Sequence, residues 1–194
     1  MKKNSYPGTF IVVEGPDGAG TTTQSKKLAE KLDAYWTCEP ADNSIGKKVD
    51  EMISGKDYSP EAVVLAFAAD RKVHLEEEVI PRLEEGETVI CDRYYHSSLV
   101  YQPVLGADYS WVKKLNRDAV RPDKTFILDV KAETGMERVN KRGHDGNIFE
   151  NLSFQQKAVL KYRGLDEKLD EDIELVDASE PKKKVFEKIN SVLK

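Results

Sequence analysis

The alternation of apolar runs with helix-compatible segments constrains the fold of this chain most strongly. Residues 9–13, Thr-Phe-Ile-Val-Val, are β-branched or aromatic throughout, as a strand buried on both faces of a parallel sheet requires. Further strands are predicted at 34–38, 88–91, 124–130 and 173–176. Helical patterns occupy 21–33, 60–85 with an expected kink at Pro81, 95–102 with 108–118, 132–142 and 180–193. This order predicts an α/β fold of three layers, in which helices flank a five-stranded parallel sheet.

The composition is that of one domain covering residues 1–194. With 30 Lys and Arg against 35 Asp and Glu, the formal net charge is −5, which argues against a protein that binds nucleic-acid backbones. No run reaches the roughly 18 apolar residues of a membrane span, and the first residues lack the apolar stretch of a signal peptide. Two cysteines, Cys38 and Cys91, fit a reducing compartment. We therefore expect a cytoplasmic protein without a membrane or nucleic-acid partner.

A glycine-rich turn connects the first strand to the first helix. It follows the phosphate-loop pattern G-x-x-x-x-G-K-[ST] except at one position, and its residues are Gly15, Pro16, Asp17, Gly18, Ala19, Gly20, Thr21 and Thr22. Such glycines let successive backbone N–H groups converge on an anion at a helix N-terminus, and the Thr22 hydroxyl is placed to face Mg²⁺. Thr21 stands where the pattern has lysine, so the loop predicts phosphate binding more securely than catalysis. A glycine-rich turn without a ligand is the alternative.

A second polar motif follows the strand at 88–91. Asp92 and Arg93 emerge at its carboxyl end, which is the edge of a parallel sheet where ligands bind. A carboxylate beside an arginine suits hydrated Mg²⁺ and a phosphate, with a local ion pair as the alternative.

Phe67 and Arg71 lie four residues apart on a helix, so a ring and a guanidinium stand side by side, as a nucleobase site needs. A core phenylalanine with a snorkelling arginine is the alternative for that pair.

Taken together, these motifs resemble the thymidylate kinase family over nearly the whole chain. The motifs are, in order, the loop at 15–20, Glu39-Pro40, Ile45-Gly-Lys-Lys48, Phe67-Ala-Ala-Asp-Arg71, Asp92-Arg-Tyr94 with Ser97-Ser98 and Tyr101-Gln102, and Val176-Asp-Ala-Ser179. The resemblance implies a P-loop kinase with a small helical lid at about 142–153, forming a homodimer. It also implies Mg²⁺-dependent transfer of the γ-phosphoryl group of ATP to dTMP, giving dTDP and ADP for dTTP synthesis.

The resemblance also implies roles for individual residues. At the dTMP site Phe67 would stack on thymine, Arg71 would donate to a thymine carbonyl and Arg93 would hold the acceptor phosphate. The same site would contain Asp17 at the deoxyribose 3′-hydroxyl, Glu39, Ser97, Ser98 near the base N3, Tyr101 where a 2′-hydroxyl would clash, and Gln102 at the base edge. ATP would be bound by residues 15–22 with Thr23, Arg142 and Ala178, and Mg²⁺ by Thr22 and Asp92. The catalytic set would be Asp92, Arg93, Thr21 and Arg142.

Three positions that commonly carry a cation in this family carry none here, and they are Thr21 in the loop, Cys38 before Glu39-Pro40, and Ile148 in the lid. Cations able to substitute lie around the lid, at Lys141, Arg142, His144, Lys157 and Arg163, and after the Glu-Pro turn, at Lys47 and Lys48. We hypothesise that Arg142 and the lysines around the lid supply the missing charge on closure. The rival interpretations are a nucleotide-binding paralogue with weak or lost kinase activity, and a kinase with a shifted acceptor such as dUMP or a deoxynucleoside. His74 is expected to serve packing or the surface, not chemistry.

Overall fold

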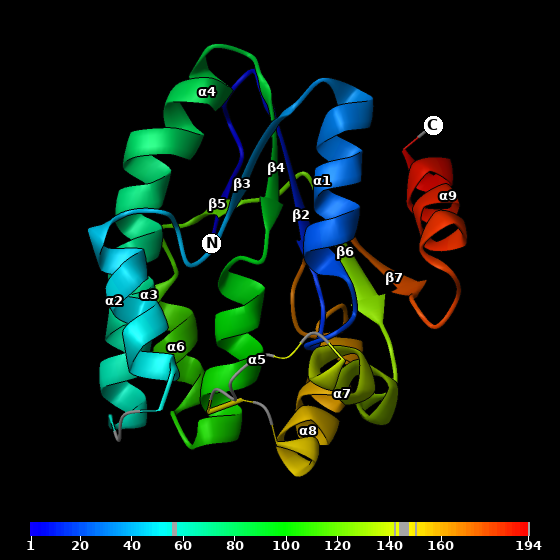
Figure 1. The fold of residues 1–194 in the computed structure, drawn as a ribbon. Helices are drawn as coiled ribbons and strands as arrows, with labels where there is room; N and C mark the ends of the chain where they lie inside the picture. Colours follow the sequence, from blue (N-terminus) through cyan, green and yellow to red (C-terminus); the bar gives the residue numbers. More distant parts are fainter. Residues whose placement is uncertain (56–57, 142, 144–147, 150, 194) are drawn as a thin grey trace.

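The computed structural model describes the chain except residues 56–57, 142, 144–147, 150 and 194 (Figure 1). Its main sheet has five parallel strands in the order β3-β4-β2-β6-β7. The strands are β2 (Thr9–Glu14), β3 (Tyr35–Cys38), β4 (Thr88–Asp92), β6 (Lys124–Asp129) and β7 (Ile173–Asp177). The predicted five-stranded parallel sheet is therefore confirmed, and each strand ends within one residue of its prediction.

Helices cover both faces of this sheet, so the molecule has three layers (Figure 1). The helices are α1 (Thr21–Leu32), α2 (Ser44–Ile53), α3 (Pro60–His74), α4 (Ile80–Glu84), α5 (Tyr95–Leu105), α6 (Tyr109–Leu115), α7 (Ala132–Asn140), α8 (Leu152–Arg163) and α9 (Lys182–Val192). Ile11 and Val13 of β2 pack in one core with α1 and α9, whereas Phe10 and Val12 pack in another with α3, α5 and α8. Successive side chains of a strand point to opposite faces, so β2 is buried on both sides, as predicted.

The segment predicted as one kinked helix at 60–85 consists of three pieces. A π-helical turn, Leu75–Val79, separates α3 from α4. Pro81 has no N–H to donate to the carbonyl of Glu77, four residues earlier, and its ring crowds that carbonyl. A wider helical turn is therefore favoured before Pro81. The Ile80 N–H bonds to the Leu75 carbonyl five residues back, which is the π pattern. Pro81 then occupies the first turn of α4, where a missing N–H leaves no bond unmade.

Two helices were not predicted, although each has a recognisable start. α2 begins after Asn43, whose Oδ1 accepts hydrogen bonds from the N–H groups of Ile45 and Gly46. α8 begins after Asn151, whose Oδ1 accepts the Ser153 N–H. An asparagine N-cap satisfies N–H groups that have no partner within the helix, and this was the signal available in the sequence.

A small second sheet lies beside the main one. It was not predicted, and it pairs β1 (Lys2–Lys3) with β5 (Val120–Arg121). Half of the predicted lid, about 142–153, lies outside the described residues, and its last two residues begin α8. Within the described part of the chain, none of the helices combines the length and apolarity needed to cross a membrane.

Candidate functional site

The glycine-rich loop lies at the carboxyl end of β2, where the chain turns into α1 (Figure 1). Gly18 has a positive φ of 76°, and a Cβ there would lie 2.7 Å from the carbonyl carbon of Gly135. Only glycine meets both conditions without strain. The contact is reciprocal, since a Cβ on Gly135 would collide with the carbonyl oxygen of Asp17. α7 therefore packs directly against the middle of the loop, through the contact of Gly135 with Asp17 and Gly18.

The sequence analysis missed Gly135, although a signal existed. Glycine inside a helix costs about 1 kcal/mol relative to alanine, so a glycine within the predicted helix at 132–142 calls for a reason such as close packing. Asp17, the loop residue it touches, lies 118 residues earlier in the chain, which no local pattern reveals.

The Thr22 hydroxyl and Asp92, predicted metal ligands from different elements, meet beside the loop. Thr22 Oγ1 donates to Asp92 Oδ2 at 2.5 Å. Asp92 Oδ1 is buried and has no hydrogen-bond partner. A buried carboxylate oxygen without a partner is costly, and Mg²⁺ binds through one or two carboxylates, hydroxyl groups and water. The pair therefore fits Mg²⁺.

Thr21, the residue in place of the loop lysine, is 6% exposed at the start of α1.

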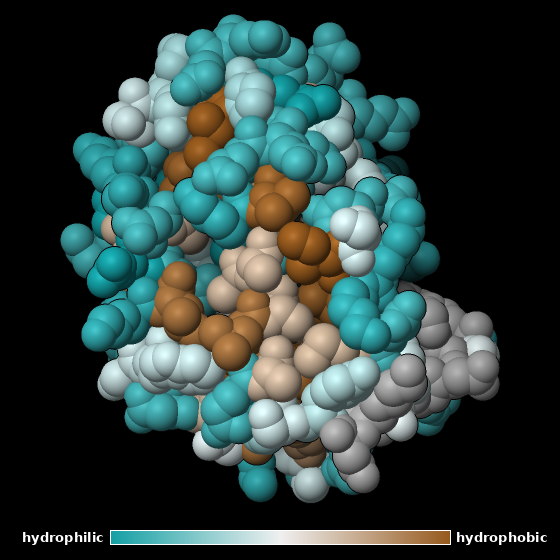
Figure 2. Space-filling model, turned by 90° about the vertical axis from the view of Figure 1, so that its left-hand side faces the viewer, coloured by the Kyte–Doolittle hydropathy of each residue, from teal (hydrophilic) through white to brown (hydrophobic). Residues whose placement is uncertain are grey.

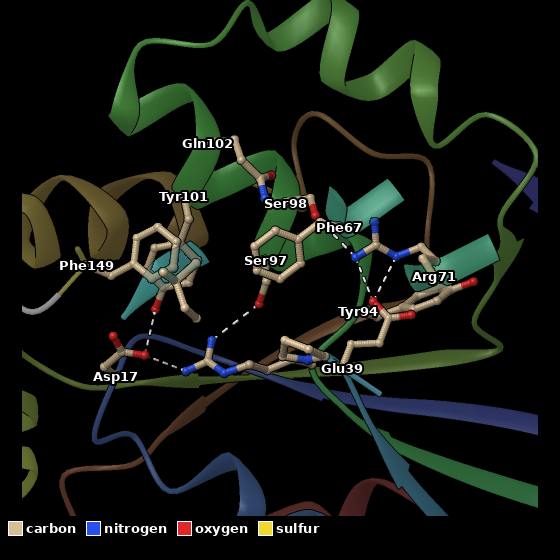
Figure 3. A pocket seen from close by; sticks show the side chains of 13 residues that line it. Asp17, Glu39, Phe67, Arg71, Tyr94, Ser97, Ser98, Tyr101, Gln102 and Phe149 are labelled. Atoms are coloured by element: carbon tan, nitrogen blue, oxygen red, sulfur yellow. Dashed lines mark hydrogen bonds and ion pairs between the residues drawn. The ribbon is translucent and has the colours of Figure 1, made fainter. Parts of the chain in front are cut away.

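A pocket opens beyond the carboxyl ends of β3 and β4, next to the loop (Figure 3). All nine residues predicted for the acceptor site line it. The lining is Asp17, Glu39, Pro40, Ile53, Phe67, Arg71, Arg93, Tyr94, Ser97, Ser98, Tyr101, Gln102 and Phe149. Gln102 Oε1 is buried there without a hydrogen-bond partner, so it can accept a hydrogen bond from a ligand. We name this cavity the acceptor pocket.

Arg71 marks one end of the acceptor pocket and is held from several sides (Figure 3). Its Nε and NH2 groups both donate to Glu39 Oε2, at 2.9 and 2.6 Å. NH1 donates to Asn116 Oδ1 at 2.6 Å, and NH2 also donates to Ser98 Oγ at 3.1 Å. Asn116, the C-cap of α6, was not singled out from the sequence. A guanidinium with most of its donors engaged by protein keeps a fixed direction toward the pocket.

His74 belongs to the packing behind this end, as expected. Its side chain is fully buried, with Nδ1 at 3.2 Å from Glu39 Oε1 and Nε2 at 2.7 Å from Thr37 Oγ1. It therefore braces Glu39, which in turn braces Arg71, and it does not line the pocket.

Asp17 lies at the opposite end of the pocket (Figure 3), and Arg93 bonds to it beside the phosphate loop. Arg93 has a left-handed backbone, φ 67°, and its guanidinium donates to Asp17 Oδ1 at 2.7 Å and to the Gly15 carbonyl at 3.0 Å. Tyr101 Oη donates to the same Asp17 oxygen at 3.2 Å. Gln155 of α8, which sequence reasoning missed, donates to Asp17 Oδ2 at 2.7 Å. Asp17 thus joins the loop to α5 through Tyr101 and to α8 through Gln155.

A second pocket lies on the other side of the loop, against β7 and α9. Its lining comprises Gly18, Ala19, Gly20, Thr23, Gln24, Arg138, Lys141, Ala178, Ser179, Glu180, Pro181, Lys182 and Val185. Thr23 and Ala178, both predicted for the ATP site, are among them. Arg138 was missed. Its NH1 group donates to the carbonyls of Ala178 at 3.1 Å and Gly18 at 3.3 Å, so it ties the loop to the strand end.

The positions that lack a cation have ordinary structural roles here. Burial, then the nearby Asp92 carboxylate, raises the pKa of Cys38 to about 11, so the side chain is a neutral thiol. Ile148 packs at the edge of the larger core. The hypothesis that Arg142 compensates concerns a residue outside the described part of the chain.

The other cations considered as substitutes are mostly engaged elsewhere. Lys47 and Lys48 pair with Asp42 and Glu51 at the surface. Arg163 pairs with Asp129. Lys141, by contrast, lines the second pocket.

Comparison with known proteins agrees with this arrangement. The family model described as thymidylate kinase matches residues 13–189. A "Probable thymidylate kinase" of Methanocaldococcus jannaschii is 44% identical over 159 residues, 81% of each chain. Proteins with the same name from Pyrococcus abyssi and Thermococcus kodakarensis are each 37% identical over 198 residues, with coverage of 95% or more of each chain. The chain therefore belongs to the thymidylate kinase family.

Proposed function

We propose that the chain transfers the γ-phosphoryl group of ATP to dTMP, giving dTDP and ADP. The observation that carries this proposal is the acceptor pocket, in which all nine expected side chains surround one cavity that borders the phosphate loop. Gly18 of the same loop lines the second pocket, next to Asp17, which lines the acceptor pocket. Two nucleotides bound on the two sides of the loop would therefore bring their phosphates together at the loop. A paralogue without kinase activity is not favoured.

The proposed recognition of the acceptor base uses the Arg71 end of the pocket. Phe67 stacks on thymine, and Arg71 donates to a carbonyl of the base. Gln102 Oε1, buried without a partner, accepts from the base edge near Ser98. Tyr101 and Asp17 contact the deoxyribose, where Tyr101 leaves no room for a 2′-hydroxyl. A site whose buried polar groups need a partner discriminates strongly against ligands that leave them unpaired.

The proposed phosphoryl transfer relies on position and charge. Arg93 holds the acceptor phosphate, while the backbone N–H groups of the loop and the N-terminus of α1 bind the donor phosphates. Thr22 and Asp92 hold Mg²⁺, which neutralises phosphate charge when bound. The acceptor is already an anion at neutral pH, so no strong general base is needed. Arg142 and lid lysines would complete the charge in place of Thr21, Cys38 and Ile148. Turnover that is unchanged in Arg142→Ala would contradict this part.

The acceptor specificity is tested by ADP release with ATP and Mg²⁺ across dTMP, dUMP, dCMP and thymidine. We expect dTMP to give the highest kcat/KM. The thymine methyl is worth about 1 to 3 kcal/mol, so dUMP should be weaker by roughly 5- to 150-fold. Tight dTMP binding without turnover would refute the kinase proposal, and a dUMP preference would point to the shifted acceptor.

A homodimer is also proposed, and an exposed apolar face of α3 supports it. Leu65 is 52% exposed, and Ala62, Ala66, Ala69 and Val73 lie on the same face of the helix with part of their surface in solvent. Figure 2 shows apolar side chains gathered on this side of the molecule. Patches of this kind are typical of protein interfaces. We expect light scattering to give a dimer and Leu65→Glu to give a monomer. A monomeric wild-type chain at micromolar concentration would contradict this proposal.

A further inference from the structure

Glu14, the last residue of β2, is a buried carboxylate that the site described so far does not use. Its side chain is fully inaccessible and surrounded by donors. Oε1 accepts the backbone N–H groups of Tyr94 at 2.7 Å and Ser97 at 3.0 Å. Oε2 accepts the Ser97 hydroxyl at 2.8 Å and the Tyr162 hydroxyl at 2.9 Å. An acidic side chain in this place is tolerated only because both oxygens are fully hydrogen-bonded.

Two of these donors belong to the N-terminus of α5, which has no cap of its own. Tyr94 is the N-cap residue, and its side chain makes no capping hydrogen bond. Glu14 fills that role from another element, because a carboxylate at a helix N-terminus accepts free N–H groups and interacts favourably with the helix dipole. This carboxylate therefore links the N-terminus of α5 directly to the end of β2.

The same contacts hold Arg93, the residue that immediately precedes this helix end. Its N–H bonds to the Val13 carbonyl at 2.9 Å, and the next N–H, that of Tyr94, bonds to Glu14. Two successive amides bonded to β2 keep Arg93 in its left-handed conformation, which an arginine rarely adopts unaided. Ser97 Oγ, oriented by Glu14, also accepts from Arg93 NH1 at 3.3 Å.

Glu14 also reaches the helix on the lid side of the pocket. Tyr162 lies near the end of α8, and its hydroxyl is one of the four donors. Gln155, two turns earlier on α8, bonds to Asp17 of the loop. α8 is thus tied at one point to the loop and at another to the residue that precedes the loop.

We propose that Glu14 is a positioning residue, which holds Arg93 and α8 in register with the phosphate loop. This inference rests on the proposed function in so far as Arg93 binds the acceptor phosphate. Glu14 touches no reacting group. Its effect passes through the Arg93 guanidinium, so it should alter the recognition of the phosphate of dTMP more than that of the nucleoside part.

The test compares Glu14→Gln with Glu171→Gln. Glutamine keeps the shape of Glu14 but replaces one acceptor oxygen by an NH₂ group, which cannot accept from its present donors. Glu171 is a matched control, because its buried carboxylate accepts the Tyr95 hydroxyl at 2.7 Å and lies 2.9 Å from His96 Nε2 on the same helix without lining either pocket. The readouts are kcat, Tm, and the ratio of dissociation constants for thymidine and dTMP.

For Glu14→Gln we expect kcat to fall at least about tenfold and the thymidine-to-dTMP ratio to shrink at least about fivefold, as a misdirected guanidinium implies. For Glu171→Gln, Tm should fall while kcat and the ratio stay within about twofold of wild type. Tyr162→Phe, which removes one donor and keeps the ring, decides the case if Glu14→Gln does not fold. We expect it to lower kcat about threefold or more.

A folded Glu14→Gln with wild-type kcat and ratio would overturn the inference, as would an equal loss of kcat in Glu171→Gln. If Glu14→Gln does not fold, wild-type kcat in Tyr162→Phe would overturn it. The binding ratio does not require turnover. A wild-type chain without dTMP kinase activity would therefore refute the proposed function, while the inference on Glu14 would still be decided by the ratio.

Discussion

Replacing Gly135 by alanine should disable the phosphate loop without replacing any residue that we assign to nucleotide binding. Gly135 lies inside α7, and its added Cβ would collide with the Asp17 carbonyl oxygen, while Gly18 of the same loop lies against the backbone of Gly135. An ordinary C···O approach is about 3.3 Å, so the loop or the helix would have to shift by about 1 Å. Asp17 connects the loop to Arg93 and Gln155, and the displacement would reach both.

Two opposing effects set the magnitude. Alanine is better than glycine inside a helix by about 1 kcal/mol, which would stabilise the fold if the space were free. Overpacking a closely packed contact costs about 1 to 3 kcal/mol, so the net change should be zero to about 2 kcal/mol of destabilisation. A misplacement of about 1 Å at a reacting site commonly costs on the order of 100-fold in rate. We therefore expect kcat to fall about 100-fold with a modest loss of stability.

The assay is coupled ADP release with ATP and dTMP, combined with urea unfolding of the same variant. Gly164→Ala is the matched control, because Gly164 ends α8 with a negative φ and its Cβ would lie 3.8 Å from the Leu160 carbonyl oxygen. It should keep wild-type kcat. A Gly135→Ala enzyme with wild-type kcat and a stability gain of about 1 kcal/mol would refute the packing argument.

Three further predictions follow from the charges of the chain. Thr21→Lys places a cation where the loop pattern has one, so we expect kcat to rise at least about tenfold, and an unchanged or lower kcat would show that another group already supplies that charge. Burial and the Asp92 carboxylate raise the pKa of Cys38 from 9.0 to about 11, so about 100-fold less thiolate is present at pH 8 than for an unperturbed thiol. Mass spectrometry should therefore find Cys38 alkylated by iodoacetamide at pH 8 about 100-fold more slowly than an unperturbed thiol. Equal rates would contradict this. Burial raises the pKa of Glu171, but hydrogen bonds from His96 and Tyr95 outweigh it, so the net pKa is lowered. The ionised Glu171 carboxylate therefore stabilises the fold above its unfolded pKa near 4.5, and this contribution is lost as pH falls through the lower folded pKa. Below pH 4.5 the free energy of unfolding should decline less steeply in Glu171→Gln than in wild type. Equal slopes would contradict this assignment.

Local patterns were sufficient for the architecture of this protein. Five apolar runs predicted five parallel strands, because a strand buried on both faces must be apolar at every position. The carboxyl ends of parallel strands share one edge of a sheet, so Asp17, Glu39 and Asp92 could be expected near each other before any coordinates existed. The prediction of one kinked helix at 60–85 was incomplete, because a proline signals a disturbed turn but does not specify a π-helical one.

The tertiary structure alone decided how the site is supported. Gly135, Gln155, Arg138 and Glu14 each act through partners about 40 to 150 residues away, and none has a local pattern that names its partner. The sequence by itself determined the sheet, the loop and the set of candidate residues that the acceptor pocket brings together, because these depend on residue type and short spacing. Which backbone approaches the loop, which side chain holds Arg93 and which oxygen of Asp92 is left without a partner depend on packing between distant elements, which only the folded chain specifies.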